Sequence, residues 1–375
     1  MKTVVFFFGT RPEALKMAPV INIFKNDKVN YNTLVALTGQ HREMLEQALN
    51  TFNIFPDYNL DIMTNGQTLG SLTMKILNGV SQLFDKIKPD LIFVQGDTTT
   101  TFTVSLAAFY QKIPVAHIEA GLRTNNKYSP FPEEANRKMA SVIASYHFPP
   151  TKEAEENLII EGIEKQTIKV TGNTIIDSLL IVSKNIDSEL DYYDNYFKNE
   201  YGINFYEKMT ILVTGHRRES FGQGLDNICH AIKELSKRKN LQIVYPVHLN
   251  PNVQEPVKRI LGNFSNIFLI PPQDYEYFVF LMKRSFLVLT DSGGIQEEAP
   301  SLGKPVLIMR DNTERPEGIK AGTAFLVGTR VSKIIGSVET LINDESIYDK
   351  MAKTKNPYGN GDASMKIYEF LSDKL

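Results

Sequence analysis

The chain has 375 residues, enough for two ordinary domains that each bury a core. Its 41 Lys and Arg residues nearly balance 43 Asp and Glu, and the formal charge of -2 gives no electrostatic reason to expect nucleic acid or an anionic membrane surface as partner. A single cysteine, Cys229, excludes an internal disulfide and a cysteine-based metal site, so we expect a reducing, cytoplasmic compartment.

Short β-rich runs recur along the chain, and each is followed by a turn and a segment of helical period. In chain order, these runs are residues 4–8, 33–37, 91–94, 115–118, 211–214, 243–247, 286–289 and 305–308. The alternation predicts an α/β fold with two Rossmann-like doubly wound domains facing each other across a cleft. The first run is too short for a signal sequence or a spanning helix, so we expect a buried strand there.

A polar segment, residues 183–208, separates the two sets of predicted strands. We place the domain boundary near Gly172, which gives an N-terminal domain over 1–172 and a C-terminal domain over 173–356. A proline and two glycines break the chain at 357–361, and a last helix is expected from Asp362 to about Leu371. We expect this segment, 357–375, to pack back on the first domain.

The segment Ser292-Gly293-Gly294 follows the apolar run 286–289 and leads into a helical pattern. Glycines let the backbone approach a ligand, and the free N–H groups of a helix start favour phosphate. A nucleotide diphosphate would fit such a turn. The alternative is a glycine turn that merely connects strand to helix.

Acidic residues follow two of the predicted strands and one proline turn. Asp97 comes after the run 91–94, Glu119 directly follows 115–118, and Glu133 opens a helix after Pro132. Each has a purely structural alternative, because Asp97 can cap a helix and acids suit a first helical turn. Parallel strands bring their carboxyl ends to one edge, however, so the sequence favours a carboxylate cluster that supplies an acid and a base.

Basic residues occupy comparable positions in both halves. Arg11 and Lys16 follow the first strand a turn and a half of helix apart, and His216 follows the run 211–214, with His248 a weaker parallel. These groups can stabilise phosphate, although a solvated charge run is the alternative. No dinucleotide-binding, Walker or metal-ligand pattern is present, so we expect neither a cofactor nor a metal.

Taken together in order, the motifs resemble those of the bacterial non-hydrolysing UDP-N-acetylglucosamine 2-epimerases. They are GTRPEALKMAP at 9–19, QGDT at 95–98, EAGLRT at 119–124, PEEANR at 132–137, GHRRE at 215–219, SGGIQEE at 292–298 and ERPEG at 314–318. The resemblance implies a GT-B-like arrangement with substrate in the interdomain cleft. It also implies interconversion of UDP-GlcNAc and UDP-ManNAc, which supplies ManNAc units for cell-surface polysaccharide.

The resemblance also implies roles for individual residues. Asp97, Glu119, Glu133 and His216 match catalytic positions. The substrate-binding positions are matched by Arg11, Lys16, Gln273, Phe278, Ser292, Gly293, Gly294, Glu298 and Arg315, of which Gln273 and Phe278 correspond to the uracil pocket and Glu298 to the ribose-binding acid. A regulatory site for a second, activating UDP-GlcNAc would involve Gln40, His41, Gln67 and His248. We also expect a homodimer.

Three departures from the family pattern concern Gly66, Phe131 and Asn312, where members often carry arginine, tryptophan and threonine. The first departure bears on the regulatory site, and the other two are conservative changes that leave the proposed chemistry intact. Alternatives to UDP-GlcNAc epimerisation are an epimerase for a related UDP-2-acetamido sugar, a hydrolysing epimerase that releases free ManNAc, a GT-B glycosyltransferase and a nucleotide-sugar sensor without turnover. Fold alone does not separate them.

Overall fold

The computed structural model describes residues 1–39, 42–62, 64 and 66–375. The chain forms two compact units, one of Met1–Ser178 with Tyr358–Leu375 and the other of Leu179–Pro357. The transition lies inside helix α7 (Thr174–Ser188), whereas the sequence placed the boundary before it, near Gly172. The first turns of this helix are tied to the first unit, because the Ser178 hydroxyl donates to the Leu15 carbonyl.

The first unit is built on a six-stranded parallel sheet in the order β3-β2-β1-β4-β5-β6. Its strands are β1 (Lys2–Phe8), β2 (Tyr31–Leu37), β3 (Tyr58–Asn59), β4 (Leu91–Gln95), β5 (Val115–Ile118) and β6 (Tyr146–Phe148). Its other helices are α1 (Arg11–Asn26), α2 (Arg42–Thr51), α3 (Leu69–Ile87), α4 (Thr99–Tyr110), α5 (Glu133–Ile143), α6 (Lys152–Ile160), the 3-10 helix η1 (Lys165–Thr167) and α16 (Ala363–Ser372).

The central strands consist mostly of apolar residues because helices cover both faces of the sheet. In β1, residues 4–8 are all buried, and the Phe6 ring stacks on Phe93 of β4 with centroids 4.1 Å apart. The ring of Phe24 on α1 meets Phe93 edge-on at 5.2 Å. Aromatic packing thus joins the helix to the middle of the sheet.

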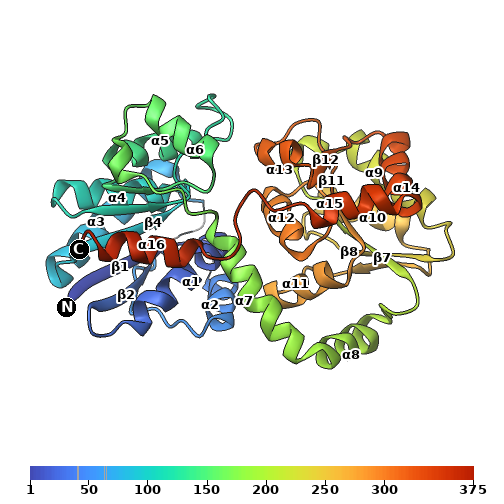
Figure 1. Cartoon of the computed structure of the whole chain (residues 1–375), viewed down its shortest axis with the longest axis horizontal. Helices are drawn as coiled ribbons and strands as arrows, with labels where there is room; N and C mark the ends of the chain where they lie inside the picture. The colour runs from blue at the N-terminus through green and yellow to red at the C-terminus, as the bar shows by residue number, and fades with distance from the viewer. Residues whose placement is uncertain (40–41, 63, 65) are drawn as a thin grey trace. The chain divides into compact units, whose positions relative to one another are not determined.

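The last helix, α16, packs against α1 at the start of the chain, as Figure 1 shows. Tyr368 meets the Phe24 ring at 5.3 Å, and its hydroxyl donates to Asp27. The buried Asp177 carboxylate accepts from the backbone N–H of Ser364 at 2.8 Å, which fixes the start of α16. Burial raises the pKa of Asp177, and the hydrogen bonds from the backbone N–H groups of Ser364 and Ala363 lower it.

The second unit repeats the same doubly wound topology, with its sheet in the order β12-β11-β10-β7-β8-β9. Its strands are β7 (Met209–Thr214), β8 (Leu241–Pro246), β9 (Ile267–Ile270), β10 (Leu287–Thr290), β11 (Val306–Ile308) and β12 (Ala324–Leu326). Its helices are α8 (Leu190–Tyr201), α9 (Gln223–Leu235), α10 (Pro251–Leu261), α11 (Tyr275–Arg284), α12 (Gly293–Glu298), α13 (Pro316–Ala321), α14 (Val331–Asn343) and α15 (Glu345–Lys353), with 3-10 helices η2 (Arg218–Ser220) and η3 (Ala299–Leu302).

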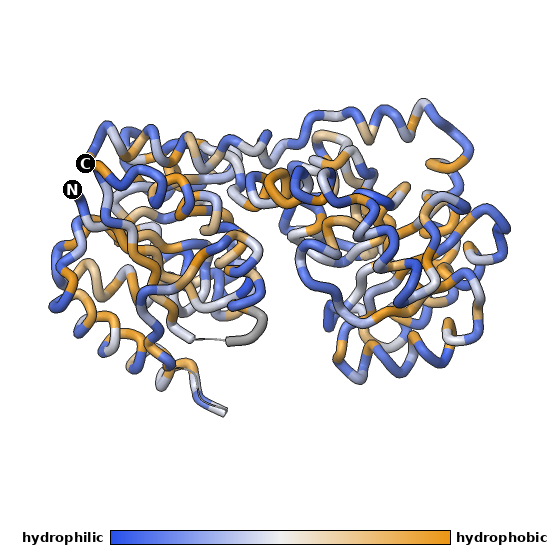
Figure 2. Tube along the Cα trace, turned by 90° about the horizontal axis from the view of Figure 1, so that it is seen from below, coloured by the Kyte–Doolittle hydropathy of each residue, from blue (hydrophilic) through white to orange (hydrophobic). Residues whose placement is uncertain are grey.

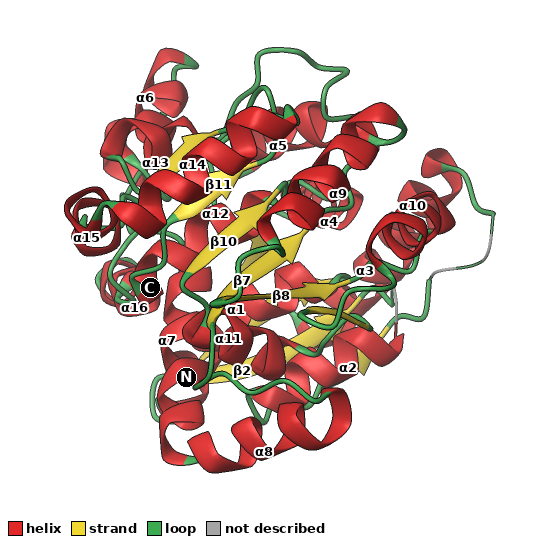
Figure 3. Cartoon of the chain, turned by 90° about the vertical axis from the view of Figure 1, so that its right-hand side faces the viewer, coloured by secondary structure: helices red, strands yellow, loops and turns green. Residues whose placement is uncertain are grey.

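Helices surround the strands of both units (Figure 3), and hydrophobic residues gather in the interior of each unit (Figure 2). The predicted α/β class with two Rossmann-like doubly wound domains is confirmed. The sequence missed β3, β6, β9 and β12, all of four residues or fewer and all at or next to a sheet edge. Among the described residues, no helix combines the length and apolarity needed to cross a membrane.

The polar segment 183–208 is largely helical. It contains the end of α7 and the whole of α8. One face of α8 is polar and exposed, and the other carries aromatic residues. Tyr193 and Phe197 stack on Phe280 of α11, each with centroids 5.4 Å apart. This face, at helical spacing within a polar sequence, attaches α8 to the second unit.

Candidate active site

Each sheet has one position where the strand order reverses, and ligands of open α/β sheets bind outside the carboxyl ends of the strands there. In the first unit this switch point lies between β1 and β4, and in the second between β7 and β10. Most of the sequence-predicted site residues lie in the turns that follow these strands. We call these turns and the side chains around them the first edge and the second edge.

The turn after β1 is held by a buried capping box. Thr10 caps α1, and the Glu13 carboxylate accepts from the backbone N–H groups of Gly9 at 3.0 Å and Thr10 at 2.8 Å. The Thr98 hydroxyl, after β4, donates to Glu13 at 2.6 Å and so links the two sides of the switch point. Burial raises the pKa of Glu13, while these donors oppose that shift. Arg11, half-buried beside this cap, makes no hydrogen bond or ion pair within the described part of the chain.

Glu119 directly follows β5 in a conformation that side chains rarely adopt. Its φ of 63° lies in the left-handed region, a strain that tends to persist where function requires it. Its carboxylate forms an ion pair with Lys16 of α1 and accepts from the Gln95 amide at 2.6 Å. Lys16 therefore serves the carboxylate cluster, which differs from the phosphate role that its spacing from Arg11 predicts.

Asp97 is paired with Arg137 of α5, and its backbone carbonyl accepts from the Asn136 amide at 3.0 Å. Thr98 caps α4, so the structural alternative in which Asp97 caps that helix is wrong. Arg137 also contacts Glu134, which is fully buried and accepts from the backbone N–H groups of residues 124 and 125 at 3.0 Å. Glu134 thus anchors the loop that follows Glu119.

Glu133, the first residue of α5, differs from the other two carboxylates. Its Oε2 atom is buried and has no hydrogen-bond partner within the described residues. Since a buried acceptor without a partner is costly, such an atom often marks a place that a ligand completes. Because Glu133 opens α5, the helix whose Asn136 and Arg137 contact Asp97, we assign it to the first edge, which then has two carboxylates matched to cations and one with an unsatisfied oxygen.

The second edge centres on His216, in the turn after β7. The Oδ2 atom of Asp291, after β10, accepts from the backbone N–H groups of His216 and Arg217, both at 2.8 Å. The His216 ring stacks on His248 with centroids 5.2 Å apart and planes 14° apart. Burial lowers the pKa of His216, an effect that the Asp291 carboxylate opposes.

Ser292, Gly293 and Gly294 begin α12, as the sequence predicts for a helix start, and the Ser292 hydroxyl does not cap that helix. A Cβ atom built on Gly293 would lie 3.5 Å from Glu314, 3.6 Å from the Arg315 guanidinium and 3.7 Å from that of Arg217. Two guanidinium groups thus approach the glycine. Arg315 is oriented by a 2.7 Å hydrogen bond to Glu297.

The predicted uridine-binding residues lie on α11, on α12 and in the loop after β9. Glu298, at the end of α12, is buried and accepts from the Tyr275 hydroxyl at 2.6 Å. Gln273 donates to the Pro271 carbonyl at 2.8 Å, and Phe278 is half-buried on α11. All three belong to the second unit.

The predicted regulatory residues are divided between the units. Gln40 and His41 lie outside the described residues. Gln67 belongs to the first unit and accepts from the Thr64 hydroxyl at 3.1 Å, with Lys75 at 3.4 Å. His248 belongs to the second unit, where it stacks on His216 and accepts at Nδ1 from the Asn250 N–H. The geometry therefore ties His248 to a catalytic candidate.

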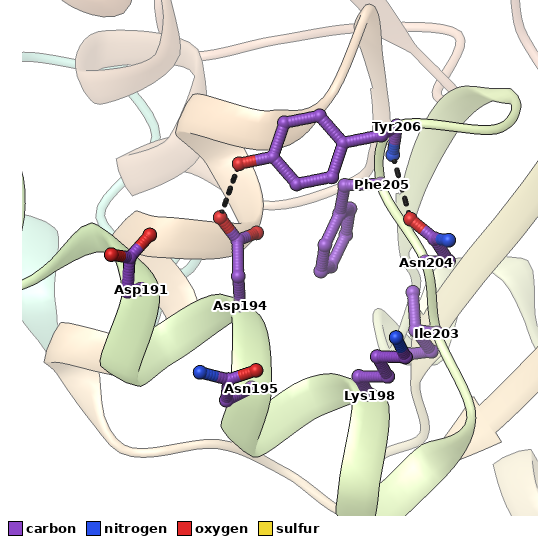
Figure 4. A pocket seen from close by; sticks show the side chains of 8 residues that line it. All are labelled: Asp191, Asp194, Asn195, Lys198, Ile203, Asn204, Phe205 and Tyr206. Atoms are coloured by element: carbon purple, nitrogen blue, oxygen red, sulfur yellow. Dashed lines mark hydrogen bonds between the residues drawn. The ribbon is translucent and has the colours of Figure 1, made fainter.

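A separate pocket of about 240 Å³ lies between α8 and residues 203–206 (Figure 4). The Tyr206 hydroxyl donates to Asp194 at 2.7 Å, and Asp194 is also paired with Arg284. Residues 203–206 precede β7 and Arg284 precedes β10, so the pocket is at the amino ends of these strands. The second edge lies at the carboxyl ends of the same strands, so the pocket and the second edge are at opposite ends of β7 and β10.

Three residues that hold the candidate site have no predicted role: Gln95 and Arg137 lie within the QGDT and PEEANR motifs, and Asp291 directly precedes SGGIQEE. Gln95 and Arg137 hold Glu119 and Asp97, and Asp291 holds the His216 turn. The position of Asp291 was a usable signal, because it comes directly after β10 as other polar site residues follow their strands. The position of Arg137 carries no such signal, because it lies within a helix and basic residues are common on the exposed faces of helices.

The family described as UDP-N-acetylglucosamine 2-epimerase matches residues 24–372 of this chain. The UDP-N-acetylglucosamine 2-epimerase of Escherichia coli strain K12 is 52% identical over 375 residues, covering 99% of this chain and 98% of that protein. The chain belongs to the UDP-N-acetylglucosamine 2-epimerase family. The resemblance seen in its motifs is thereby confirmed.

Solved structures of family members are similar over the whole chain. The Neisseria meningitidis enzyme bound to UDP-GlcNAc has a TM-score of 0.91 at 48% identity, covering 99% of this chain and 100% of that one. The Methanocaldococcus jannaschii enzyme in complex with UDP-GlcNAc and UDP has a TM-score of 0.81 at 35% identity, with both chains fully covered. This family fold therefore extends from bacterial to more distant members.

Proposed function

We propose that the protein is a non-hydrolysing UDP-GlcNAc 2-epimerase that interconverts UDP-GlcNAc and UDP-ManNAc. Family membership supports this substrate, since similar proteins are named for it and solved with it. The observation that carries the chemistry is the set of three differently held carboxylates at the first edge, of which Glu133 alone has a buried oxygen without a partner among the described residues.

The reaction must invert a carbon whose hydrogen is not acidic. C2 of the sugar is not beside a carbonyl, so its proton can be removed only as the C1–O bond to UDP breaks and C1 gains oxocarbenium character. Loss of the C2 proton and of UDP gives a 2-acetamidoglucal. Return of a proton to the opposite face of C2, with addition of UDP at C1, gives the epimer. Proton-transfer groups are therefore required on both faces.

The first edge supplies these groups. We assign proton transfer at C2 to Glu133, because its unsatisfied oxygen can accept a proton without breaking an existing ion pair. Glu119, with Lys16 and Gln95 on its carboxylate, is the candidate for the opposite face. Asp97, fixed by Arg137, contributes charge that favours the oxocarbenium-like transition state.

The second edge holds the departing diphosphate. The α12 start at Ser292, Gly293 and Gly294 offers backbone N–H groups, and Arg315 and His216 supply positive charge as UDP leaves. Arg11 has no partner in the described part of the chain and is a further candidate phosphate ligand. Gln273, Phe278 and Glu298 would bind the uridine.

The remaining parts of the proposal are a cytoplasmic homodimer that supplies ManNAc units for cell-surface polysaccharide, with a second UDP-GlcNAc as activator at Gln40, His41, Gln67 and His248. The single cysteine and the absence of a membrane-crossing helix in the described residues are compatible with this setting. His248 supports the regulatory part, because its ring stacks on His216.

The test is to incubate purified protein with UDP-GlcNAc alone and follow the sugar anomeric signals by proton NMR. We expect UDP-ManNAc to accumulate to an equilibrium mixture with no acceptor present. Free ManNAc as the first product would indicate a hydrolysing enzyme, and dependence on an added acceptor would indicate a glycosyltransferase. Binding without any turnover would indicate a sensor.

A further inference from the structure

Asp291 occupies a central position at the second edge. It follows β10, which pairs in parallel with β7, and its side chain is 1% exposed. Its Oδ2 atom accepts two backbone N–H groups from the turn after β7, at His216 and Arg217. One oxygen of the carboxylate therefore fixes the backbone that carries the His216 ring.

The other oxygen, Oδ1, has a different environment. It is buried, makes no hydrogen bond within the described residues, and lies 3.6 Å from Nδ1 of His216. This separation is within ion-pair range for a protonated ring and longer than a hydrogen bond.

Within the part of the chain that the structure describes, three ionisable groups face the His216 ring. His248, after β8, stacks on it at 5.2 Å, Arg217 is its chain neighbour, and Asp291 faces Nδ1 from β10. Asp291 is the anion among them. His248 and Arg217 disfavour a positive charge on the ring, as burial does, and Asp291 favours it.

We propose that Asp291 is a positioning residue that orients His216 with Nδ1–H toward its Oδ1 and supports the ring's positive charge during epimerisation. A carboxylate beside one ring nitrogen selects the tautomer and leaves the other nitrogen, Nε2, for the ligand. Because Nε2 must donate to stabilise an anionic leaving group, the ring is effective when both nitrogens are protonated. This role rests on the proposed function of the second edge in UDP departure.

The first test compares Asp291→Asn with the wild-type protein. The amide oxygen of asparagine can still accept the two backbone N–H groups, so the turn is retained while the charge is lost. We expect the alkaline limb of the pH profile of kcat to move to lower pH by on the order of one unit. At pH values above both limbs, kcat should then fall about tenfold, with UDP affinity changing much less.

A double variant separates this role from a merely structural one. In a His216→Asn background, Asp291→Asn should cause no further loss of kcat, because the carboxylate acts through the ring. An additive loss, or an unchanged pH profile with weaker UDP binding, would overturn the proposal. Asp291→Ala, which also removes the backbone acceptor, should lose more activity and stability than Asp291→Asn.

The second test uses the wild-type protein and does not depend on a folded Asp291 variant. Nitrogen-15 NMR of the His216 ring, assigned by comparison with His216→Asn, should show the proton on Nδ1 in the neutral form. A proton on Nε2 instead would contradict the proposal. This tautomer measurement is valid whether or not the protein turns over UDP-GlcNAc, so failure of the proposed function would be seen separately as absent turnover.

Discussion

The two domains share one strand order, yet the turns at their switch points carry opposite chemistry. The first edge gathers three carboxylates, two of them neutralised by Lys16 and Arg137. The second edge combines a helix start and a glycine with the cationic side chains of Arg217 and Arg315. In the proposed function, the same topology therefore serves proton transfer in one domain and anion binding in the other, through the side chains that follow each strand.

The difference extends to the acids that hold each edge in place. At the first edge, Glu13 and Glu134 accept backbone N–H groups and fix the turns around the carboxylate cluster. At the second edge, Asp291 performs the same task with one oxygen and faces His216 with the other. Buried acids thus build both edges, and only in the second does a holding acid also face a candidate catalytic ring.

The largest expected effect is at the first edge. Glu133→Gln removes the proton-accepting oxygen with little change in shape, so kcat should fall on the order of a hundredfold to ten-thousandfold. Calorimetric UDP affinity should be nearly unchanged, since the second edge is intact. Glu156→Gln, at an exposed position on α6, is the matched control and should retain normal turnover. Normal turnover in folded Glu133→Gln would remove the assignment of Glu133.

The His216→Asn variant tests whether the charge of the His216 ring at the second edge stabilises the departing UDP. We expect kcat to fall on the order of a hundredfold, as for loss of one charge-stabilising donor, with a smaller change in UDP affinity. His230→Gln, exposed on α9, is the control. If the variant binds UDP much more weakly and retains its kcat, His216 contributes to ground-state binding alone.

The Gly293→Val variant tests whether the space beside Gly293 at the second edge is needed to bind phosphate. A Cβ atom added at Gly293 meets nothing closer than 3.5 Å in the protein, so we expect the fold to be retained. It would occupy the space beside Arg315 and Arg217, and we expect UDP affinity to fall at least about tenfold. Gly336→Val, where a Cβ meets nothing within 4 Å, is the control on α14 of the same domain. Equal UDP affinity in both variants would contradict phosphate binding at Gly293.

The smallest expected effect concerns stability beneath the first edge. His117 is buried in β5 with Nε2 bonded to the Gly96 carbonyl, and burial lowers its pKa to about 3. The unfolded state therefore binds a proton below pH 6.5 that the folded state does not, so stability falls as pH decreases from 6.5 toward 3. Between pH 7.5 and pH 5.5, the shifted pKa of His117 lowers the free energy of unfolding by about 1.4 kcal/mol.

Urea unfolding at these two pH values checks the contribution of His117. His117→Gln retains a side-chain donor for Gly96 and should show a smaller decrease in unfolding free energy between the two pH values than the wild type. His230→Gln should match the wild type. An equal decrease in His117→Gln and the wild type would show that His117 does not carry this pH dependence.

Much of the fold could be predicted from the sequence, because strands buried on both faces, such as 4–8 and 91–94, contain continuous apolar runs. The missed strands β3, β6 and β12 have only two or three residues and give little of that signal, whereas β9, with the sequence Ile-Phe-Leu-Ile, is an apolar run that was missed although the signal is present. For the candidate site, residues after strands were found because topology places them together. Their partners, such as Arg137, could not be predicted, because the ion pair between Arg137 and Asp97 joins positions 40 residues apart in the sequence.

The division of chemistry between the two edges is tested most directly by deuterium incorporation at C2 in D2O. Wild-type protein with UDP-GlcNAc should give UDP-ManNAc that carries deuterium at C2. Glu133→Gln should bind UDP with near-normal affinity and lose that exchange. Epimerisation without C2 deuterium in the wild type, or undiminished C2 exchange in folded Glu133→Gln, would contradict proton transfer by the first edge.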